Sequence, residues 1–235
     1  MKKLLSVSLA TFAFAAVADY SPITVEVRNI TPSVQNTIIP VPVTTIGSTN
    51  PVSVHDLVKA ANLPDGTMLY YFDGTNYKAW QKDDTGAWTT PDISATIGSA
   101  AVSAASTTIH VSVGAALWVS FPSDVTPSEQ TIVVYGAPVA SKTSTIAVGT
   151  NLLANPTGAA VNGATLATKL AAITPVKGDK ITYLGGEGSY SGYFTYSGSV
   201  WKKVVGKTIT EGLDSLPANG GFWYISKGGA GTINW

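Results

Sequence analysis

The chain has 235 residues, no cysteine, and 14 basic residues balanced by 14 acidic ones, so its formal net charge is zero. Without cysteine, neither disulfides nor thiol chemistry contributes to stability or function. Without a basic excess, the chain lacks the electrostatic footprint of a nucleic-acid-binding protein, so we expect no nucleic-acid partner. Charged residues make up only 12% of the chain, against about 25% in typical domains. Low charge removes repulsion between molecules and favours self-association.

Residues 1–18 have the composition of a secretory signal peptide. The chain begins Met-Lys-Lys, continues with an apolar run over residues 4–17, and places alanine at positions 16 and 18. These are the features of an export signal, and the run is shorter than the roughly 20 residues that span a bilayer. We expect a bacterial protein exported to the cell surface or the extracellular space, with the periplasm as an open alternative. No membrane span is expected after removal of the signal.

Residues 19–43 predict an extended strand arm. Ile23, Val25 and Val27 alternate with polar residues, which is the period of a half-buried strand. Four prolines flank this stretch and exclude central positions in a sheet, because proline has no N–H to donate. Two interpretations remain open. The arm is either an edge strand on the first domain or a strand that pairs with a neighbouring subunit.

The pattern of residues 63–88 recurs at residues 174–201. Both stretches begin beside a proline, turn at a glycine, run through an apolar-aromatic strand and two hairpin turns, and end on a tryptophan. Self-similarity at a fixed offset is typical of a duplicated unit. Each copy also contains one predicted short helix, over residues 54–62 in the first copy and around Leu166 and Leu170 in the second.

These elements predict a mainly β fold with two tandem homologous domains, each sandwich-like or barrel-like and each with one short helix. Each predicted domain has about 100 residues, which is enough for a core without disulfides. The predicted boundaries are a signal peptide at 1–18, the N-terminal strand arm at 19–43, a first domain at 44–136, a linker at 137–143 and a second domain at 144–235.

The second copy carries glycine, aromatic and leucine-proline signatures in a fixed order. These are Gly178-Asp179-x-Ile181, Ser197-Gly198-x-x-Trp201 and Leu216-Pro217-x-x-x-Gly221-Phe222-Trp223. The pattern resembles a small β module of exported surface proteins of environmental bacteria. The resemblance covers residues 178–226 and, less closely, residues 66–120, where Thr67 stands in place of Asp179. It implies a location at the cell surface.

The sequence contains no recognisable catalytic set. His55 and His110 lie outside any metal-ligand spacing such as H-x-x-x-H, and no G-x-S-x-G nucleophile elbow occurs. Asp73, Asp83 and Asp84 fall in predicted hairpin turns, where aspartate is favoured for its hydrogen bonds to the backbone. We therefore expect neither an enzyme nor a cofactor. Calcium at these turns stays an open alternative.

Aromatic residues cluster in the hairpins of both copies. Because side chains alternate across a strand, some of these rings face away from the core. Outward rings stack on sugars or become buried in protein interfaces. The alternative is that they fill the cores and the contacts between domains. The candidate ligand or interface residues are Tyr70, Phe72, Trp80, Tyr193 and Tyr196.

These features favour a non-enzymatic structural protein that assembles with copies of itself into a filament, sheath or surface layer. In this hypothesis Ile23, Val25 and Val27 insert into an apolar groove on the next subunit. Deletion of residues 20–30 should then leave folded monomers that no longer polymerise. The alternative is a carbohydrate- or matrix-binding surface module with a polysaccharide as its partner, for which Trp80→Ala is the test.

Overall fold

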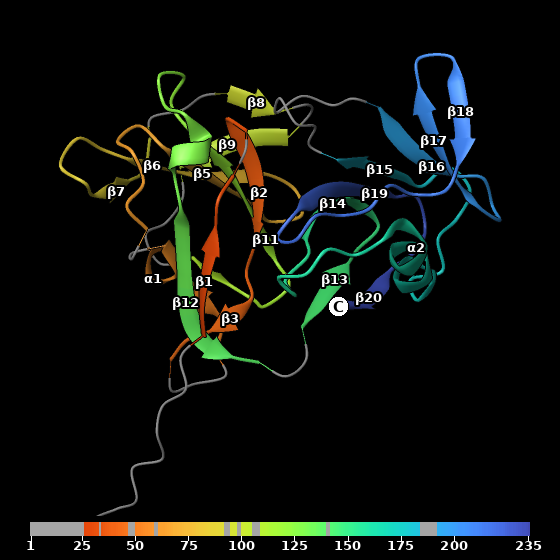
Figure 1. Cartoon of the computed structure of the whole chain (residues 1–235), viewed down its shortest axis with the longest axis horizontal. Coiled ribbons are helices and arrows are strands. Elements are labelled where there is room, and N and C mark those ends of the chain that lie inside the picture. The colour runs from red at the N-terminus through yellow and green to blue at the C-terminus, as the bar shows by residue number, and fades with distance from the viewer. Residues whose placement is uncertain are drawn as a thin grey trace, which may run out of the picture.

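The structure of the chain is a computed structural model. It describes residues 26–32, 34–46, 50–58, 61–91, 95–97, 100–104, 109–139, 142–183 and 192–235. These residues form a mainly β protein with two short α-helices, which confirms the predicted fold class. The sheets gather into two groups that lie side by side, one from each half of the chain (Figure 1).

The first half is organised by a seven-stranded sheet. Its strands are β2 (Asn36–Pro40), β5 (Met68–Phe72), β6 (Tyr77–Lys82), β7 (Trp88–Thr89), β8 (Ala95–Ile97), β9 (Ala100–Ala104) and β11 (Ala116–Ser120). They follow the order β2-β11-β5-β6-β9-β8, with β7 beside β6. The neighbours are antiparallel except for β6 and β9, which are parallel.

Smaller elements complete the first half. They are β1 (Glu26–Ile30), β3 (Val43–Thr44), β4 (Val52–Ser53), β10 (His110–Val111), β12 (Ile132–Pro138), helix α1 (Val54–Val58) and the 3-10 turn η1 (Pro127–Glu129). β1, β12 and β3 form one sheet, and β10 pairs with β4. Ser53 caps α1, because its hydroxyl accepts the N–H of Asp56 at 3.0 Å. One apolar core joins these elements to the large sheet.

The second half contains a six-stranded antiparallel sheet in the order β14-β19-β15-β16-β17-β18, a separate pair β13-β20, and helix α2. The bounds are β13 (Thr143–Ile146), β14 (Gly149–Ala154), α2 (Gly163–Ala171), β15 (Lys180–Tyr183), β16 (Tyr193–Tyr196), β17 (Trp201–Val205), β18 (Thr208–Glu211), β19 (Gly221–Ser226) and β20 (Gly231–Asn234). Leu166 and Leu170 of α2 are buried in the core of the second half.

The order of strands repeats between the halves. β2-β11-β5-β6 in the first half corresponds to β14-β19-β15-β16 in the second, and the β1-β12 pair corresponds to β13-β20. The register also corresponds, since Trp118 lies opposite Ile38 and Trp223 lies opposite Leu152. The internal repeat therefore extends to strand pairing. The division into two domains stays a prediction, because the halves share a buried contact.

The described residues of the predicted N-terminal arm belong to the first half. β1 pairs with β12 along five residues, β2 pairs with β11, and Ile30 is buried in the core. β1 and β2 occupy the places in the first half that β13 and β14 occupy in the second, so the described part of the arm takes part in the repeat. The predicted linker is also shorter than expected, since β12 reaches Pro138 and β13 begins at Thr143.

Each large sheet has one face on the core of its own half and a second face that points away from that core. The two sheets pack against each other through these second faces. Trp118 and Trp223 meet edge to face, with ring centroids 5.6 Å apart at an interplanar angle of 87°. Ile38, Ala116, Leu152 and Ala154 complete this buried cluster. Trp223 donates its Nε1 hydrogen to the hydroxyl of Tyr77 at 2.8 Å. We call this cluster the inter-half contact; its apolar burial holds the halves together.

Candidate functional site

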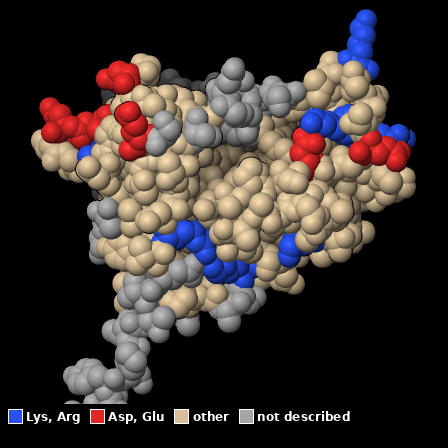
Figure 2. Space-filling view, viewed as in Figure 1, with Lys and Arg blue, Asp and Glu red and all other residues tan. Residues whose placement is uncertain are grey.

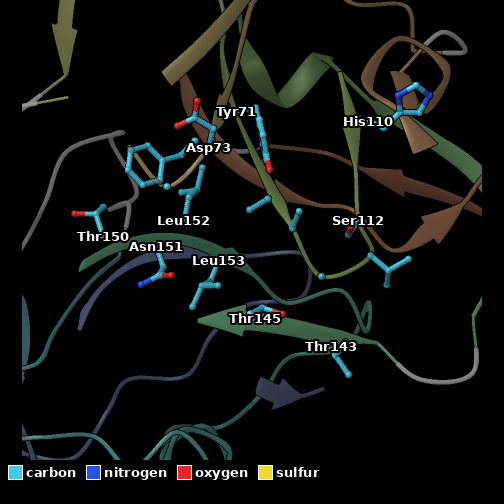
Figure 3. Close-up of a pocket in the computed structure, with 16 residues that line it drawn as sticks. Tyr71, Asp73, His110, Ser112, Thr143, Thr145, Thr150, Asn151, Leu152 and Leu153 are labelled. Atoms are coloured by element: carbon cyan, nitrogen blue, oxygen red, sulfur yellow. The ribbon is translucent and has the colours of Figure 1, made fainter. Parts of the chain in front are cut away.

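A cleft of about 370 Å³ lies beside the inter-half contact (Figure 3). It is formed by the end of β5 and the turn after it, the β10–β11 connection, and strands β13 and β14. Its polar lining residues are Tyr71, Asp73, His110, Ser112, Thr143, Thr145, Thr150 and Asn151. A cleft of this volume falls in the range of small-molecule sites, which is about 300–1,000 Å³.

Two polar side chains of the cleft serve mainly to shape its turns. Asp73 accepts the backbone N–H groups of Thr75 and Asn76 at 2.9 and 2.8 Å, which confirms the predicted turn. Asn151 accepts the N–H of Ala147 and donates to the carbonyl of the same residue. The hydroxyl-bearing residues and the ring of Tyr71, which points into the cleft in Figure 3, are what the site offers to a ligand.

Charge in the cleft is modest. Partial burial acts to raise the pKa of Asp73, but the N–H groups of Asn76 and Thr75 and the ammonium of Lys78 outweigh it and lower the pKa. Burial and the nearby Asp73 raise the pKa of Tyr71, so its phenol is protonated at neutral pH. The cleft thus presents a carboxylate and neutral hydroxyls.

The geometry of the cleft brings together no catalytic triad. His110 lies at the rim, across the view from Asp73 (Figure 3), and His55 lies elsewhere, edge-on to Trp80 at 6.4 Å. Within the described ranges, no group of three or more histidine, aspartate or glutamate side chains is placed to hold a metal ion. Binding through hydroxyl groups and rings is the chemistry that these residues support.

Trp80, which was predicted to be one of the rings that face away from the core, is fully buried. Its exposed fraction is 0%, and it lies in the core of the first half. The prediction that Trp80 contacts a ligand or another subunit is wrong. β6 places Tyr77 and Ala79 on the opposite face, so alternation gives Trp80 to the core. The proposed Trp80→Ala test would report on stability and not on binding.

Tyr70 and Phe72 lie on the second face of the first sheet, near the inter-half contact. The Tyr70 ring lies 5.1 Å from that of Trp118, and the Phe72 ring lies 4.9 Å from that of Tyr77. Both rings are half-buried. They do face away from the core of their own half, but the second half packs beside them.

Tyr193 and Tyr196 lie on opposite faces of β16. Tyr193 is 38% exposed on the outer face, with the Lys180 ammonium 5.0 Å from its ring centroid. Tyr196 packs 5.2 Å from Trp201 on the side that α2 covers. Tyr196, but not Tyr193, lines an apolar cavity of about 440 Å³, whose other lining residues are Ala167, Ala171, Pro175, Ser199, Val200, Trp201, Glu211 and Gly212.

Of the three candidate assembly residues, the structure describes only Val27; Ile23 and Val25 lie outside the described residues. Val27 is 63% exposed, while its own backbone pairs with Tyr135 of the same chain. β1 is the terminal strand of its sheet, so its outer side has no partner among the described strands.

A second edge strand, which was not predicted from the sequence, is β18. This strand ends the six-stranded sheet, and all four of its residues are exposed. The sequence signal for this hairpin is Gly206-Lys207, which lies between Val204-Val205 and the alternating Thr208-Ile209-Thr210. Two residues that include a glycine, placed between two stretches of strand-forming residues, favour a hairpin.

The chain matches no protein-family model, and neither curated proteins nor solved structures gave a match. Among the described residues, no helix has the length and apolar character needed to cross a membrane.

Proposed function

We propose that this chain is an exported, non-enzymatic structural subunit that assembles with copies of itself by strand pairing. The observation that carries the proposal is the edge strand β18, whose four residues are all exposed and whose outer side pairs with no described strand. Exposed edges are templates for pairing with another chain, and natural proteins usually protect them. This edge lacks proline and a bulge.

The surface supports the same proposal. Figure 2 shows a face on which charged side chains are few and uncharged residues dominate. Large apolar side chains are exposed at several places in the fold: Val27 on β1, Val148 between β13 and β14, and Ile209 on β18. Weak charge leaves little repulsion between copies, and exposed apolar groups favour burial between them.

The test is the state of association of the purified protein without residues 1–18. We expect its sedimentation coefficient to rise with protein concentration and electron micrographs to show regular polymers. A monomer at every concentration, in low and in physiological salt, would contradict the proposal.

A role of the N-terminal arm in assembly has to be tested with a substitution and not with a deletion. Removal of residues 20–30 would take away β1 and the buried Ile30, so it would expose β12 and destabilise the monomer. Val27→Lys changes only an exposed side chain. If the arm contributes to assembly, this variant should fold normally and sediment as smaller species than the unmodified protein; unchanged sedimentation would exclude Val27 from the interface.

A carbohydrate-binding function is the second candidate, and the cleft of Figure 3 favours it. Its threonine and serine hydroxyls suit the hydroxyl groups of a sugar, and Tyr71 and Phe72 supply apolar ring surface. Thr145→Lys would place a long charged side chain in this cleft from an exposed position.

Retention on insoluble polysaccharides such as cellulose and chitin separates the two candidates. Binding in the cleft predicts that Thr145→Lys lowers retention, while Thr89→Lys, at an exposed position on β7, does not. No retention of the unmodified protein on any of a panel of polysaccharides would contradict this second function and leave self-assembly as the remaining candidate.

A further inference from the structure

The hairpin of β17 and β18 projects at one corner of the molecule (Figure 1). Val205 lies opposite Thr208 across the Gly206-Lys207 turn. In a two-residue hairpin the residues that flank the turn bond to each other. Because backbone groups of an antiparallel strand point alternately to its two sides, the N–H and C=O of Ile209 and Glu211 point to the open side of β18.

An apolar row crosses the outer face of the sheet and ends at this open side. Tyr193 lies opposite Val204, and Val204 lies opposite Ile209. Ile209 is 63% exposed at the end of the row. In the adjacent row Lys202 lies opposite Glu211, so a positive charge is followed by a negative one at the sheet edge.

We infer that β18 pairs antiparallel with β18 of a second copy of this chain, about a two-fold axis that passes through Ile209. The inference rests on the proposed function and names the surface and the register. In this register the two Ile209 residues face each other and exchange backbone hydrogen bonds. The apolar row then continues through Ile209, Val204 and Tyr193 of the copy, and the two sheets become one.

Charge complementarity selects this register. Lys207 of each copy lies opposite Glu211 of the other, so the row that begins with Lys202 and Glu211 continues with a second lysine. Opposite charges in directly facing positions stabilise a strand pair, and like charges destabilise it.

Neighbouring registers lack this match. An axis through Thr210 would place Ile209 opposite the Glu211 carboxylate, and an axis through Glu211 would place two carboxylates against each other. A one-residue slip would also turn side chains to the wrong face of the joined sheet. The register through Ile209 therefore satisfies the backbone, the apolar row and the charges together.

The contact is small. Stable complexes bury about 1,200–2,000 Å², and one pair of four-residue strands covers much less. The pair is therefore transient in dilute solution and gains strength where several contacts act in one assembly. A method that traps the pair covalently suits such a contact.

Because the chain has no cysteine, single cysteine substitutions give an unambiguous cross-linking test. Ile209→Cys should form disulfide-linked dimers on mild oxidation, since facing Cα atoms about 5.5 Å apart lie within disulfide range. Thr210→Cys is the matched control. It faces Thr208 of the copy, so it should not cross-link with itself but should cross-link when mixed with Thr208→Cys.

Charge variants provide the second test, on the Ile209→Cys background. Lys207→Glu places two carboxylates opposite each other and should lower the dimer yield several-fold, and Glu211→Lys should do the same with two lysines. The double variant Lys207→Glu/Glu211→Lys restores opposite charges and should restore the yield. Failure of the double variant to recover, with each single variant reduced, would overturn the register.

The outcomes separate this inference from the proposed function. If the unmodified protein assembles but Ile209→Cys gives no dimers, or Thr210→Cys alone gives as many, another surface carries assembly and the inference fails. If the unmodified protein stays monomeric and Ile209→Cys gives no dimers, both fail. Selective cross-linking of Ile209→Cys supports the inference.

Discussion

Two residues at one position of the repeat show how the halves diverge. Thr67 and Asp179 are both fully buried, and their carbonyls accept the N–H of Lys82 and of Tyr196 at 2.9 Å. The Asp179 carboxylate also accepts the hydroxyl of Tyr224 at 2.7 Å. In the first half Val119 takes the place of Tyr224 and has no hydroxyl to satisfy. The buried carboxylate and its phenol partner are therefore both present in the second half and both absent at the corresponding positions of the first.

This pairing predicts coupled effects on stability. Tyr224→Phe should cost about 1–3 kcal/mol, because it removes a hydrogen bond to a buried carboxylate. Asp179→Thr should cost more, since it leaves the Tyr224 hydroxyl and the Lys227 N–H without the acceptor they use. The double variant should lose about 1 kcal/mol less stability than the sum of the losses of the two single variants. Urea unfolding measures all four proteins; strict additivity would contradict the coupling.

Tyr183→Phe is the control for a lost phenol. The Tyr183 hydroxyl donates to the exposed carbonyl of Asp214 at 3.2 Å, where water can replace it. Its removal should cost less than that of the Tyr224 hydroxyl.

The turn at Asp73 predicts a loss of stability in acid. Its folded-state pKa lies below the ordinary 3.8, so the carboxylate stabilises the fold above that pH. This contribution disappears as the pH falls through the folded pKa. Urea midpoints measured between about pH 3 and pH 7 should fall less steeply toward acid in Asp73→Asn than in the unmodified protein. Equal pH profiles for Asp73→Asn and the unmodified protein would contradict the role of this turn.

Helix α2 depends on Asn162, the N-cap residue that precedes it. The Asn162 side chain accepts the N–H of Thr165 at 2.8 Å, which satisfies one of the free donors at the start of the helix. Asn162→Ala should lower the free energy of unfolding by about 1 kcal/mol, and Asn162→Asp, which keeps the acceptor, should not. Thermal or urea denaturation checks this, and equal losses for both substitutions would show that capping is not the cause.

Strands and hairpins could be predicted from the sequence where local chemistry decides them. The turns at Asp73 and Asp83 form because each aspartate side chain accepts backbone N–H groups of the residues that follow it in the chain. Asp83, for example, accepts the N–H of Thr85 at 2.9 Å. The helix predicted over residues 54–62 is confirmed over Val54–Val58; residues 59 and 60 lie outside the described residues, and residues 61 and 62 are not helical. The boundary was missed because nothing in a short apolar pattern marks the last turn of a helix.

The faces of the strands could not be predicted. Alternation shows that Trp80 and Ala79 point in opposite directions, but only the neighbours of β6 decide which direction is the core. Both faces of this sheet are apolar, because one packs on its own core and the other near the second half. In the candidate site, likewise, Tyr71 and Thr145 line the same cleft only because the two halves pack together.

At the scale of the whole molecule, the inter-half contact predicts how the chain unfolds. A Cβ on Gly221 would lie 2.2 Å from Cγ2 of Ile38, so no larger residue fits between the sheets there. Gly221→Val should force the halves apart. The unfolding curve measured by tryptophan fluorescence should then precede the curve measured by circular dichroism, while both coincide in the unmodified protein.

Gly228→Ala is the control for this variant. A Cβ at Gly228 would lie 3.4 Å from Val176, which is ordinary contact, so both curves should still coincide. Coincident curves in Gly221→Val would mean that the inter-half contact does not hold the halves together.

The contact between Trp118 and Trp223 has a consequence for the ancestry of the chain. The two residues correspond in the repeat, β2 meets β14, and the crossed pairs β2 with β19 and β11 with β14 also touch. Contacts between equivalent surfaces are those of an isologous homodimer. A single ancestral unit with this surface would have paired with its twin at a rate set by concentration. Gene duplication and fusion would make that encounter intramolecular, so that it no longer depends on concentration.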